Sequence, residues 1–312
     1  MASAPAGMPP IFRDEPPRGR PRELQDGLNR FIYHPLSARL ARLLRPTGVS
    51  PNAVSVAGCL LIWAAAWAYS QLAWPHGVLL GLSFHMLWHV VDGADGDLAR
   101  LTGKASPLGE LVDGVCDYCG HAVLYVALAA MLDDEIGLSA WPLAFAAAAS
   151  HAAQTNHAET QRRSYLWWAY GIPWIKHAKA AGDERLERRT WFTLAFGGFL
   201  RGYLWLGKKM ARHSAAIDAE IEAAQSDPGR IRLIRRLARR SARGSLALQK
   251  ADGPNPRTII LGASMALGSP LWFFLAEAVL LNLLLVASVR HHNRVARRLV
   301  EKLRSDGRCG DG

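Results

Sequence analysis

Long apolar runs are the feature that most restricts how this chain can fold. They lie near residues 51–73, 77–91, 115–132, 138–153 and 257–289. A helix needs about 20 mostly apolar residues to cross a bilayer, and these runs approach that length when their polar ends are included. The stretch 278–289 has only two polar residues, Asn282 and Ser288, and is too uniformly apolar for a soluble amphipathic helix, the alternative interpretation. The sequence therefore predicts an all-α fold, a polytopic membrane bundle of about six transmembrane helices.

The net charge of the chain is strongly positive. Lysine and arginine total 37 residues against 26 aspartate and glutamate residues, a net charge of +11. Nucleic-acid binding is one interpretation of such a sequence, but the basic segments adjoin the apolar runs. Anionic membrane lipids are therefore the expected partner, and no nucleic acid is expected. The first 27 residues are rich in proline and arginine and lack the apolar centre of a cleavable signal peptide.

The order of polar and apolar segments divides the chain into six regions. Apolar residues at helical spacing between Leu28 and Leu44, with arginines around them, predict a helix on the membrane surface. Lysine and arginine favour the cytoplasmic side of a membrane, so we expect both termini in the cytoplasm. The regions are a disordered N-terminus (1–27), a juxtamembrane amphipathic helix (28–48), a core of four spans (49–160), a basic cytoplasmic helical insert (161–256), a transmembrane hairpin of two spans (257–290) and a cytoplasmic tail (291–312).

The hairpin has a rival interpretation. An even number of spans requires that 257–290 be broken at the Gly-Ser-Pro of 268–270. In the rival map, 191–206 crosses the membrane and 257–289 is a single span. That map would place the arginine-rich segment 230–243 outside, against the usual distribution of positive charge.

One helical face of the insert is apolar. Ile231, Ile234, Leu237 and Ala238 share this face, and arginines occupy the rest of the helix. Two interpretations remain open: the helix lies on an anionic leaflet, or it is a solvated charged helix.

Four aspartates are expected to meet at the cytoplasmic end of the bundle. Asp92 and Asp95 follow the second apolar run and are three positions apart, so they share one helical face, whereas Asp97 points elsewhere. Asp113 and Asp117 are four apart and share a face of the next helix. The turn between the two helices lets them pack antiparallel, which brings both pairs together.

Carboxylates gathered in this way repel one another unless cations neutralise them. Arg100 and Lys104 are too few to do so. Mg²⁺ or Mn²⁺ would resolve the repulsion, because these ions take oxygen ligands and keep positions open for phosphate oxygens. Two ions about 4 Å apart can hold a phosphoryl group during substitution, and the missing side chains at Gly93, Gly96 and Gly109 would let a nucleotide approach. Proton or metal transport is the alternative for membrane aspartates.

The spacing Asp92-x-x-Asp95-Gly96-x-x-Ala99-Arg100-x8-Gly109-x-x-x-Asp113-x-x-x-Asp117 resembles the signature of the CDP-alcohol phosphatidyltransferase family without a mismatch. This signature covers 26 residues and is highly specific. The resemblance extends over roughly residues 50–155 and leaves the insert and the extreme termini uncovered.

The resemblance implies a phospholipid-synthesising enzyme, which transfers a phosphoalcohol from a CDP-linked donor to a hydroxyl and releases CMP. By similarity, Asp92, Asp95, Asp113 and Asp117 hold two Mg²⁺ or Mn²⁺ ions, and Asp117 also takes the proton of the acceptor hydroxyl. Gly96, Arg100 and Ser106 match positions that contact the nucleotide and its phosphates, and Asn52, Ser55 and Gly109 are expected at the same ligand. For Asn52 and Ser55, the alternative role is a helix cap.

The family member is left open by the motif. The stretch 100–113 also resembles choline and ethanolamine phosphotransferases, which use a CDP-amino alcohol and diacylglycerol or ceramide, but Gly114-Val115 stands where those enzymes carry His-Gly. Most bacterial members instead use CDP-diacylglycerol and a small polar alcohol. A non-catalytic relative and a transporter are further alternatives. We expect a bacterial inner-membrane protein with its active site in the cytoplasm, with association as a homodimer left open.

Other polar residues have weaker patterns. His85 and His89 are four apart and are interpreted as a satisfied polar pair in the bundle, with approach to the substrate as the alternative. Arg162 and Arg163 fit either an acceptor phosphate or the cytoplasmic end of a span. The C-x-x-C motif at 116–119 lacks the second pair or histidines of a zinc site, so the cysteines are interpreted as packing residues.

Overall fold

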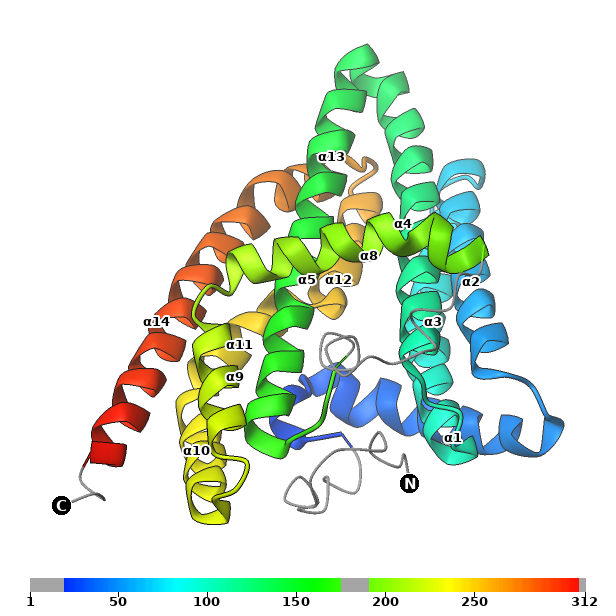
Figure 1. Ribbon diagram of the computed structural model, residues 1–312. Coiled ribbons are helices and arrows are strands. Elements are labelled where there is room, and N and C mark those ends of the chain that lie inside the picture. Colours follow the sequence, from blue (N-terminus) through cyan, green and yellow to red (C-terminus); the bar gives the residue numbers. More distant parts are fainter. Residues whose placement is uncertain (1–19, 175–190, 309–312) are drawn as a thin grey trace. The chain divides into compact units, whose positions relative to one another are not determined.

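Every regular element in the described part of the chain is helical, which confirms the all-α prediction for these residues. The computed structural model describes residues 20–174 and 191–308, and Figure 1 shows their helices as coiled ribbons. Of the N-terminus expected to be disordered, residues 1–19 lie outside the described residues.

The chain divides into two compact units. The first unit comprises Asp26–Ala152 and Pro254–Asn282, and the second comprises the described parts of 4–25, Ala153–Gly253 and Leu283–Gly312. Helices α5 and α14 each contribute residues to both units.

The first unit contains most of the apolar helices. They are, in chain order, η3 (Asn29–Tyr33), α1 (His34–Leu44), η4 (Arg45–Thr47), α2 (Pro51–Gln71), α3 (His76–Thr102), α4 (Pro107–Ile136), η5 (Gly137–Ser139), the start of α5 (Ala140–Tyr170), α12 (Pro254–Ala266), α13 (Leu271–Leu275), η6 (Ala276–Leu280) and the first residues of α14 (Leu281–Arg308). Two of these elements, η3 and η6, are π-helical.

Three helical segments are long and apolar enough to cross a membrane: Pro51–Gln71, Leu108–Tyr170 and Leu271–Ser305. The second segment is a hairpin of α4 and α5, joined through the short η5 and visible as the green ribbons of Figure 1. These segments identify a multi-pass membrane protein, whereas the number of six spans stays a prediction. Helix α8 (Trp191–Met210), the extra span of the rival map, is not among the three.

Helix α2 packs against both α3 and α4. A Cβ added to Gly81 of α3 would lie only 2.5 Å from the ring of Tyr69 on α2, so the glycine is what lets this ring lie against the helix. On the α4 side, a Cβ on Gly120 would lie 3.3 Å from Ile62. Close approach through small residues is typical of helices that associate in lipid. This packing places the last turns of α3 and the first turns of α4, which carry the aspartates, on the same side of the unit.

Helix α1 presents a small-residue face to α3. Ser37 donates a hydrogen bond of 2.8 Å from its hydroxyl to the carbonyl of Val90, and Ala41 is fully buried beside it. The large apolar side chains of Phe31 on the preceding η3 and of Leu43 on α1 are instead 71% and 72% exposed. This arrangement fits a helix that packs on the bundle while its apolar face contacts lipid.

The break expected at 268–270 lies between α12 and α13, where Gly268 has a φ of +89°. This left-handed conformation favours glycine. Helix α14 then continues through residue 290 to Arg308, so the expected start of the tail at 291 does not coincide with a helix end. The domain boundaries of the sequence map stay predictions.

The second unit has an apolar core of its own. It contains η2 (Arg22–Leu24), the end of α5, α8, α9 (Ser214–Ala223), α10 (Pro228–Ser241), α11 (Arg243–Ala251) and the greater part of α14. The apolar face of α10 lies in this core, packed with Trp167 and Trp168 of α5 and Ile217 of α9. Protein side chains and not a lipid leaflet therefore cover this face, whereas exposed arginines such as Arg236 on the rest of the helix fit the alternative of a solvated charged helix.

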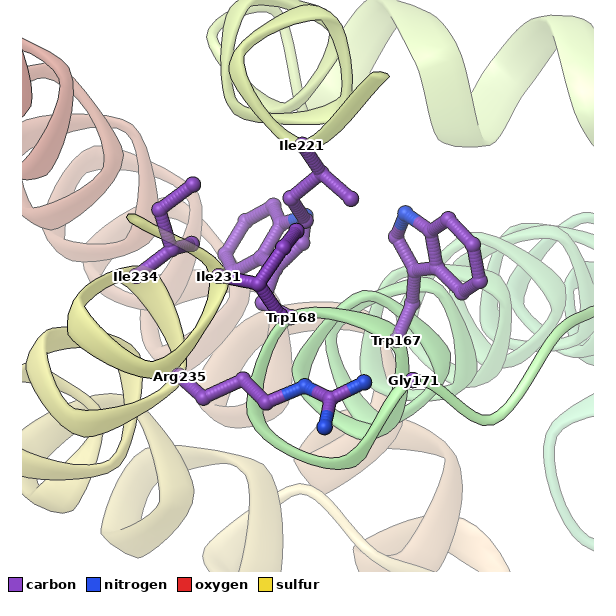
Figure 2. Close-up of a pocket in the computed structure, with 7 residues that line it drawn as sticks. All are labelled: Trp167, Trp168, Gly171, Ile221, Ile231, Ile234 and Arg235. Carbon is purple, nitrogen blue, oxygen red and sulfur yellow. The ribbon is translucent and has the colours of Figure 1, made fainter. Parts of the chain in front are cut away.

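Figure 2 shows a small pocket in this core, between α5, α9 and α10. Its lining consists of Trp167, Trp168, Gly171, Ile221, Ile231, Ile234 and Arg235. The side chain of Arg235 is buried and extends toward Trp167 and Gly171. The pocket thus combines two indole rings with one guanidinium group.

The segment before the first unit is tied to the end of α5. Glu23 accepts hydrogen bonds from the hydroxyls of Tyr165, at 2.8 Å, and Tyr170. Burial raises the pKa of Glu23, but hydrogen bonds from Tyr170, Tyr165 and the backbone together with the charge of Arg239 outweigh burial, so this pKa lies below its usual value. The carboxylate therefore stays charged at neutral pH and holds η2 in the second unit.

Candidate active site

Three of the four predicted aspartates meet in the first unit. Asp92 and Asp95 project from α3 and Asp113 projects from α4, and one carboxylate oxygen of each lies within 4.8 Å of the others. Asp95 is 5% exposed, and the other two are half-buried. The expected convergence of two helical pairs is thus present for three of the carboxylates.

Asp117 lies one turn further along α4 and is not part of this group of three. Its side chain is half-buried. The structure thus brings three of the four carboxylates within 4.8 Å of one another, and Asp117 follows one turn, about 5.4 Å of helical rise, later on the same helix. The fourth carboxylate can serve a different atom from the other three.

Ser55 of α2 holds one of the clustered carboxylates. Its hydroxyl donates a hydrogen bond of 2.6 Å to Oδ2 of Asp95, and both side chains are buried. The alternative role of Asn52 and Ser55 as a helix cap belongs instead to Ser50, whose hydroxyl accepts from the amide of Ala53 at 3.2 Å. Ser55 thus fixes a carboxylate, a role that the sequence did not predict.

The start of α4 brings three other predicted residues together. Ser106 caps this helix, since its hydroxyl accepts from the amide of Gly109 at 3.1 Å. A Cβ on Gly109 would lie 3.3 Å from that hydroxyl and 3.7 Å from Oδ1 of Asn52 on α2. Asn52, Ser106 and Gly109 therefore share one small area, in which the missing side chain of Gly109 leaves the polar atoms accessible.

Arg100 extends over Gly96 on α3. A Cβ on Gly96 would lie 3.5 Å from a guanidinium nitrogen of Arg100. The same guanidinium pairs with Asp97 at 2.5 Å, and 54% of the Arg100 side chain is exposed. An exposed ion pair contributes little to stability, about 0–1 kcal/mol, so the guanidinium can exchange Asp97 for an anionic ligand at low cost.

Two buried histidines, His85 and His89, precede Asp92 on α3. His89 is hydrogen-bonded to Thr258 of α12 at 2.8 Å, whereas His85 has no partner for its buried Nδ1 among the described residues. The interpretation of both as a satisfied pair is therefore wrong for His85. The two rings stack 6.0 Å apart, and His121 of α4 lies 5.9 Å from His85.

Several polar residues of this region escaped the sequence patterns. They are His121, Tyr125, His151, Arg257 and Glu277. Two of them left a signal: His121 is four residues after Asp117, and Glu277 is a charge inside an apolar run. The others come from separate helices, and only the fold brings them together.

Two other sets of predicted residues have structural partners. Arg162 and Arg163 both pair with Glu159, at 2.7 and 2.6 Å, within the second unit. Cys59, Cys116 and Cys119 are free thiols. Neither set adds a ligand to the acidic group.

The acidic group fits a divalent cation. Carboxylate oxygens are the ligands that Mg²⁺ and Mn²⁺ prefer, and three of them converge on one place here. A softer metal would favour thiolate or imidazole ligands, which this group lacks. Repulsion between the carboxylates falls when a cation binds, so the arrangement favours an occupied state.

Comparison with known proteins gives a consistent result. Residues 48–166 match the protein-family model described as CDP-alcohol phosphatidyltransferase. Choline/ethanolaminephosphotransferase 2 of Arabidopsis thaliana is 30% identical over 108 residues, which cover 31% of this chain and 26% of the relative. Archaetidylinositol phosphate synthase of Aeropyrum pernix is 33% identical over 106 residues, which cover 32% of this chain and 52% of the relative.

The corresponding synthase of Pyrococcus horikoshii is 29% identical over 115 residues, 36% of this chain and 55% of the relative. The chain thus spans between about a quarter and about half the length of the curated relatives it matches. No solved structure matches the chain. The matched segment contains both aspartate pairs and every residue predicted at the nucleotide.

Proposed function

We propose that the protein is a phosphotransferase of the CDP-alcohol phosphatidyltransferase type, whose family model residues 48–166 match, and that it transfers a phosphoalcohol from a CDP-linked donor to a hydroxyl acceptor and releases CMP. One observation supports this most: the carboxylates of Asp92, Asp95 and Asp113, which belong to the family signature, meet within 4.8 Å.

In the proposed reaction, the oxygen of the acceptor hydroxyl attacks the phosphorus that carries the donor's alcohol. A new phosphorus–oxygen bond forms, and the bond from this phosphorus to the oxygen bridging it to CMP breaks. CMP leaves with that bridging oxygen. Asp117 takes the proton of the acceptor hydroxyl, since its carboxylate lies one turn beyond the clustered group on the same helix.

Asp92, Asp95, Asp113 and Asp117 are the proposed ligands of two divalent ions, Mg²⁺ or Mn²⁺. Bound there, such ions would act as Lewis acids and neutralise the negative charge of the pyrophosphate oxygens. The hydrogen bond from Ser55 keeps one carboxylate oxygen of Asp95 in place. Fixing an acidic side chain in this way reduces the reorganisation that the binding of a metal ion requires.

The nucleotide is assigned to the surface between the starts of α2 and α4 and the end of α3. Arg100 would exchange Asp97 for a phosphate oxygen. Asn52, Ser106 and Gly109 would contact the nucleotide where no side chain blocks the start of α4. Gly96, which has no side chain, would leave room for the nucleotide beneath the guanidinium of Arg100.

Release of CMP tests this proposal directly. The full-length protein would be purified into nanodiscs and given CDP-diacylglycerol or CDP-choline, each with a hydroxyl acceptor, and CMP would be measured by chromatography. We expect CMP release that stops with excess EDTA and returns with Mg²⁺ or Mn²⁺. A transporter or a non-catalytic relative would release no CMP. Undiminished release in excess chelator would contradict the metal assignment.

We also propose a bacterial inner-membrane location with both termini and the active site in the cytoplasm, facing anionic lipids. Asp134, at the end of α4, and Ser241, at the end of α10, are both exposed. In a variant without the native cysteines, Asp134→Cys should react with an impermeant thiol reagent in intact cells, and Ser241→Cys should not. Labelling of Ser241→Cys from outside would support the rival map with 191–206 as a span.

A further inference from the structure

A group of buried and half-buried histidines continues from the proposed active site into the first unit. Nδ1 of His121 donates a hydrogen bond of 2.9 Å to the backbone carbonyl of Asp117. The ring of His121 lies 5.9 Å from that of His85 and 5.2 Å from that of His151. His121 thus connects two rows of polar side chains, called the first arm and the second arm below. It lies one turn of α4 after Asp117, the proposed base.

The first arm runs through α5 to η6 and α12. Nδ1 of His151 lies 3.1 Å from the hydroxyl of Tyr125 and 3.5 Å from a carboxylate oxygen of Glu277. The same oxygen lies 3.4 Å from Nε of Arg257. Both charged side chains are almost fully buried, Arg257 at 5% and Glu277 at 0% exposure. Their opposite charges balance, so this arm ends in a neutral pair.

The second arm runs along α3. His85 stacks on His89, which is hydrogen-bonded to Thr258 and stacks against Tyr33 at a ring distance of 4.8 Å. Both rings of α3 are buried, His85 at 4% and His89 at 7% exposure. Nδ1 of His85 is buried and has no hydrogen-bond partner in the part of the chain that the structure describes.

Each arm ends at a π-helical turn. Tyr33 is the last residue of η3, and Glu277 lies in η6. π-Helical turns are rare and occur frequently at functional sites. Both π-helical turns of the described chain therefore contribute a side chain to the same polar group.

A purely structural role explains this group poorly. Ionisable side chains inside a membrane bundle are costly and usually mark a functional site. A buried ring nitrogen without a partner is also costly. Apolar residues of the same size would pack between these helices without either cost. The unpartnered atom of His85 instead points to a ligand that supplies a hydrogen bond.

We propose that His85, His121, His151 and Tyr125 bind the acceptor alcohol, and that this acceptor is a small neutral polyol. The inference rests on the proposed function. Hydroxyl groups both donate and accept hydrogen bonds, as neutral imidazole and phenol do, so several hydroxyls suit several such side chains. The single hydroxyl of a diacylglycerol would leave most of them unused. A phosphorylated acceptor would need an unbalanced positive charge, whereas Arg257 is paired with Glu277.

In this assignment, one hydroxyl of the polyol reaches Asp117 and the remaining hydroxyls reach the histidines one turn deeper. The donor is then the lipid partner, CDP-diacylglycerol. His85, His121, His151 and Tyr125 are binding residues that select the acceptor.

The test compares acceptors and variants in the full-length protein in nanodiscs. Glycerol, myo-inositol and glycerol 3-phosphate would each be offered with CDP-diacylglycerol, and diacylglycerol would be offered with CDP-choline, while CMP is measured. We expect glycerol or myo-inositol to support the fastest release. His85→Phe and Tyr125→Phe should each raise the KM for that polyol about 3- to 10-fold, the loss of one hydrogen bond, with the KM for CDP-diacylglycerol unchanged.

Tyr69→Phe is the matched control. It also removes a buried hydroxyl in the first unit, but its ring lies against Gly81. Its acceptor KM should equal that of the parent. A structural role of the group would lower turnover or thermal stability without a selective change in acceptor KM, and that result would overturn the inference.

The different donor and acceptor pairs offered in this experiment separate two kinds of failure. CMP release only from CDP-choline with diacylglycerol, or only with glycerol 3-phosphate, would overturn the neutral polyol and leave the proposed function standing. No CMP from any pair would overturn the proposed function itself, and the acceptor assignment with it.

Discussion

The first unit and the region around α10 in the second unit place their polar and apolar residues in opposite ways. In the first unit, Phe145 and Leu79 are 79% and 61% exposed, whereas Asp95 and Glu277 are buried. In the second unit, the apolar face of α10 is buried against tryptophans of α5, and arginines such as Arg236 face outward. The first pattern suits helices surrounded by lipid, and the second suits a helix, α10, with one face in water.

This difference shows where chemistry is to be expected. A buried carboxylate in a lipid-facing bundle carries a large cost and needs a compensating role. Arginines on a water-facing helix carry no such cost and need no special explanation. The buried acids and histidines of the first unit are therefore the functional candidates, and the basic surface of the second unit is not.

The largest effect is expected at the proposed base. Asp117→Asn keeps the shape of the side chain but loses the proton acceptor, so turnover should fall by at least about 10²-fold, with donor affinity retained. Asp134→Asn is the control, because Asp134 is exposed at the other end of α4. CMP release by Asp117→Asn within a few-fold of the parent would show that another group takes the proton.

A smaller effect is expected where α2 supports the acidic group. Ser55→Ala removes the hydrogen bond to Asp95, and the loss of such an outer contact typically weakens metal binding or activity about 10- to 100-fold. The Mg²⁺ concentration for half-maximal CMP release should rise accordingly. Ser50→Ala on the same helix removes only a cap and should leave that concentration unchanged. Equal behaviour of the two variants would remove Ser55 from the site.

The smallest effects on chemistry are expected in the second unit, where substitutions should act on stability. Ile234 is 1% exposed and Arg236 is exposed two residues later. Ile234→Ala should destabilise that unit by about 2–5 kcal/mol, whereas Arg236→Ala should change stability by less than about 0.5 kcal/mol. Thermal unfolding of the two variants measures the difference. A larger loss of stability in Arg236→Ala than in Ile234→Ala would contradict the assignment of the arginine face of α10 to water.

The acidic group was predictable because helical spacing alone sets it. Asp92 and Asp95, like Asp113 and Asp117, lie at separations that share a helix face, and one short turn joins the two helices. The histidine group was not predictable in the same way. His85, His121 and His151 come from three helices, and Arg257 from a fourth, so only the packing of the bundle makes them neighbours.

The apolar face of α10 teaches a related limit. Residues at helical spacing show that a face is covered, but they do not show by what. Lipid, water-excluding protein and a partner all satisfy the same pattern. Only the fold shows that Ile231 and Ile234 pack on Trp167 and Trp168.

Binding of Mn²⁺ to the purified full-length protein tests the central claim most directly, that the clustered aspartates of the first unit hold divalent metal. Electron paramagnetic resonance during a titration counts the bound ions, and Mg²⁺ should displace them. We predict two Mn²⁺ ions per chain, with affinity lowered at least about tenfold by Asp95→Asn or Asp113→Asn and unchanged by Asp134→Asn. Mn²⁺ binding that is as tight in Asp95→Asn and Asp113→Asn as in the parent would contradict the account.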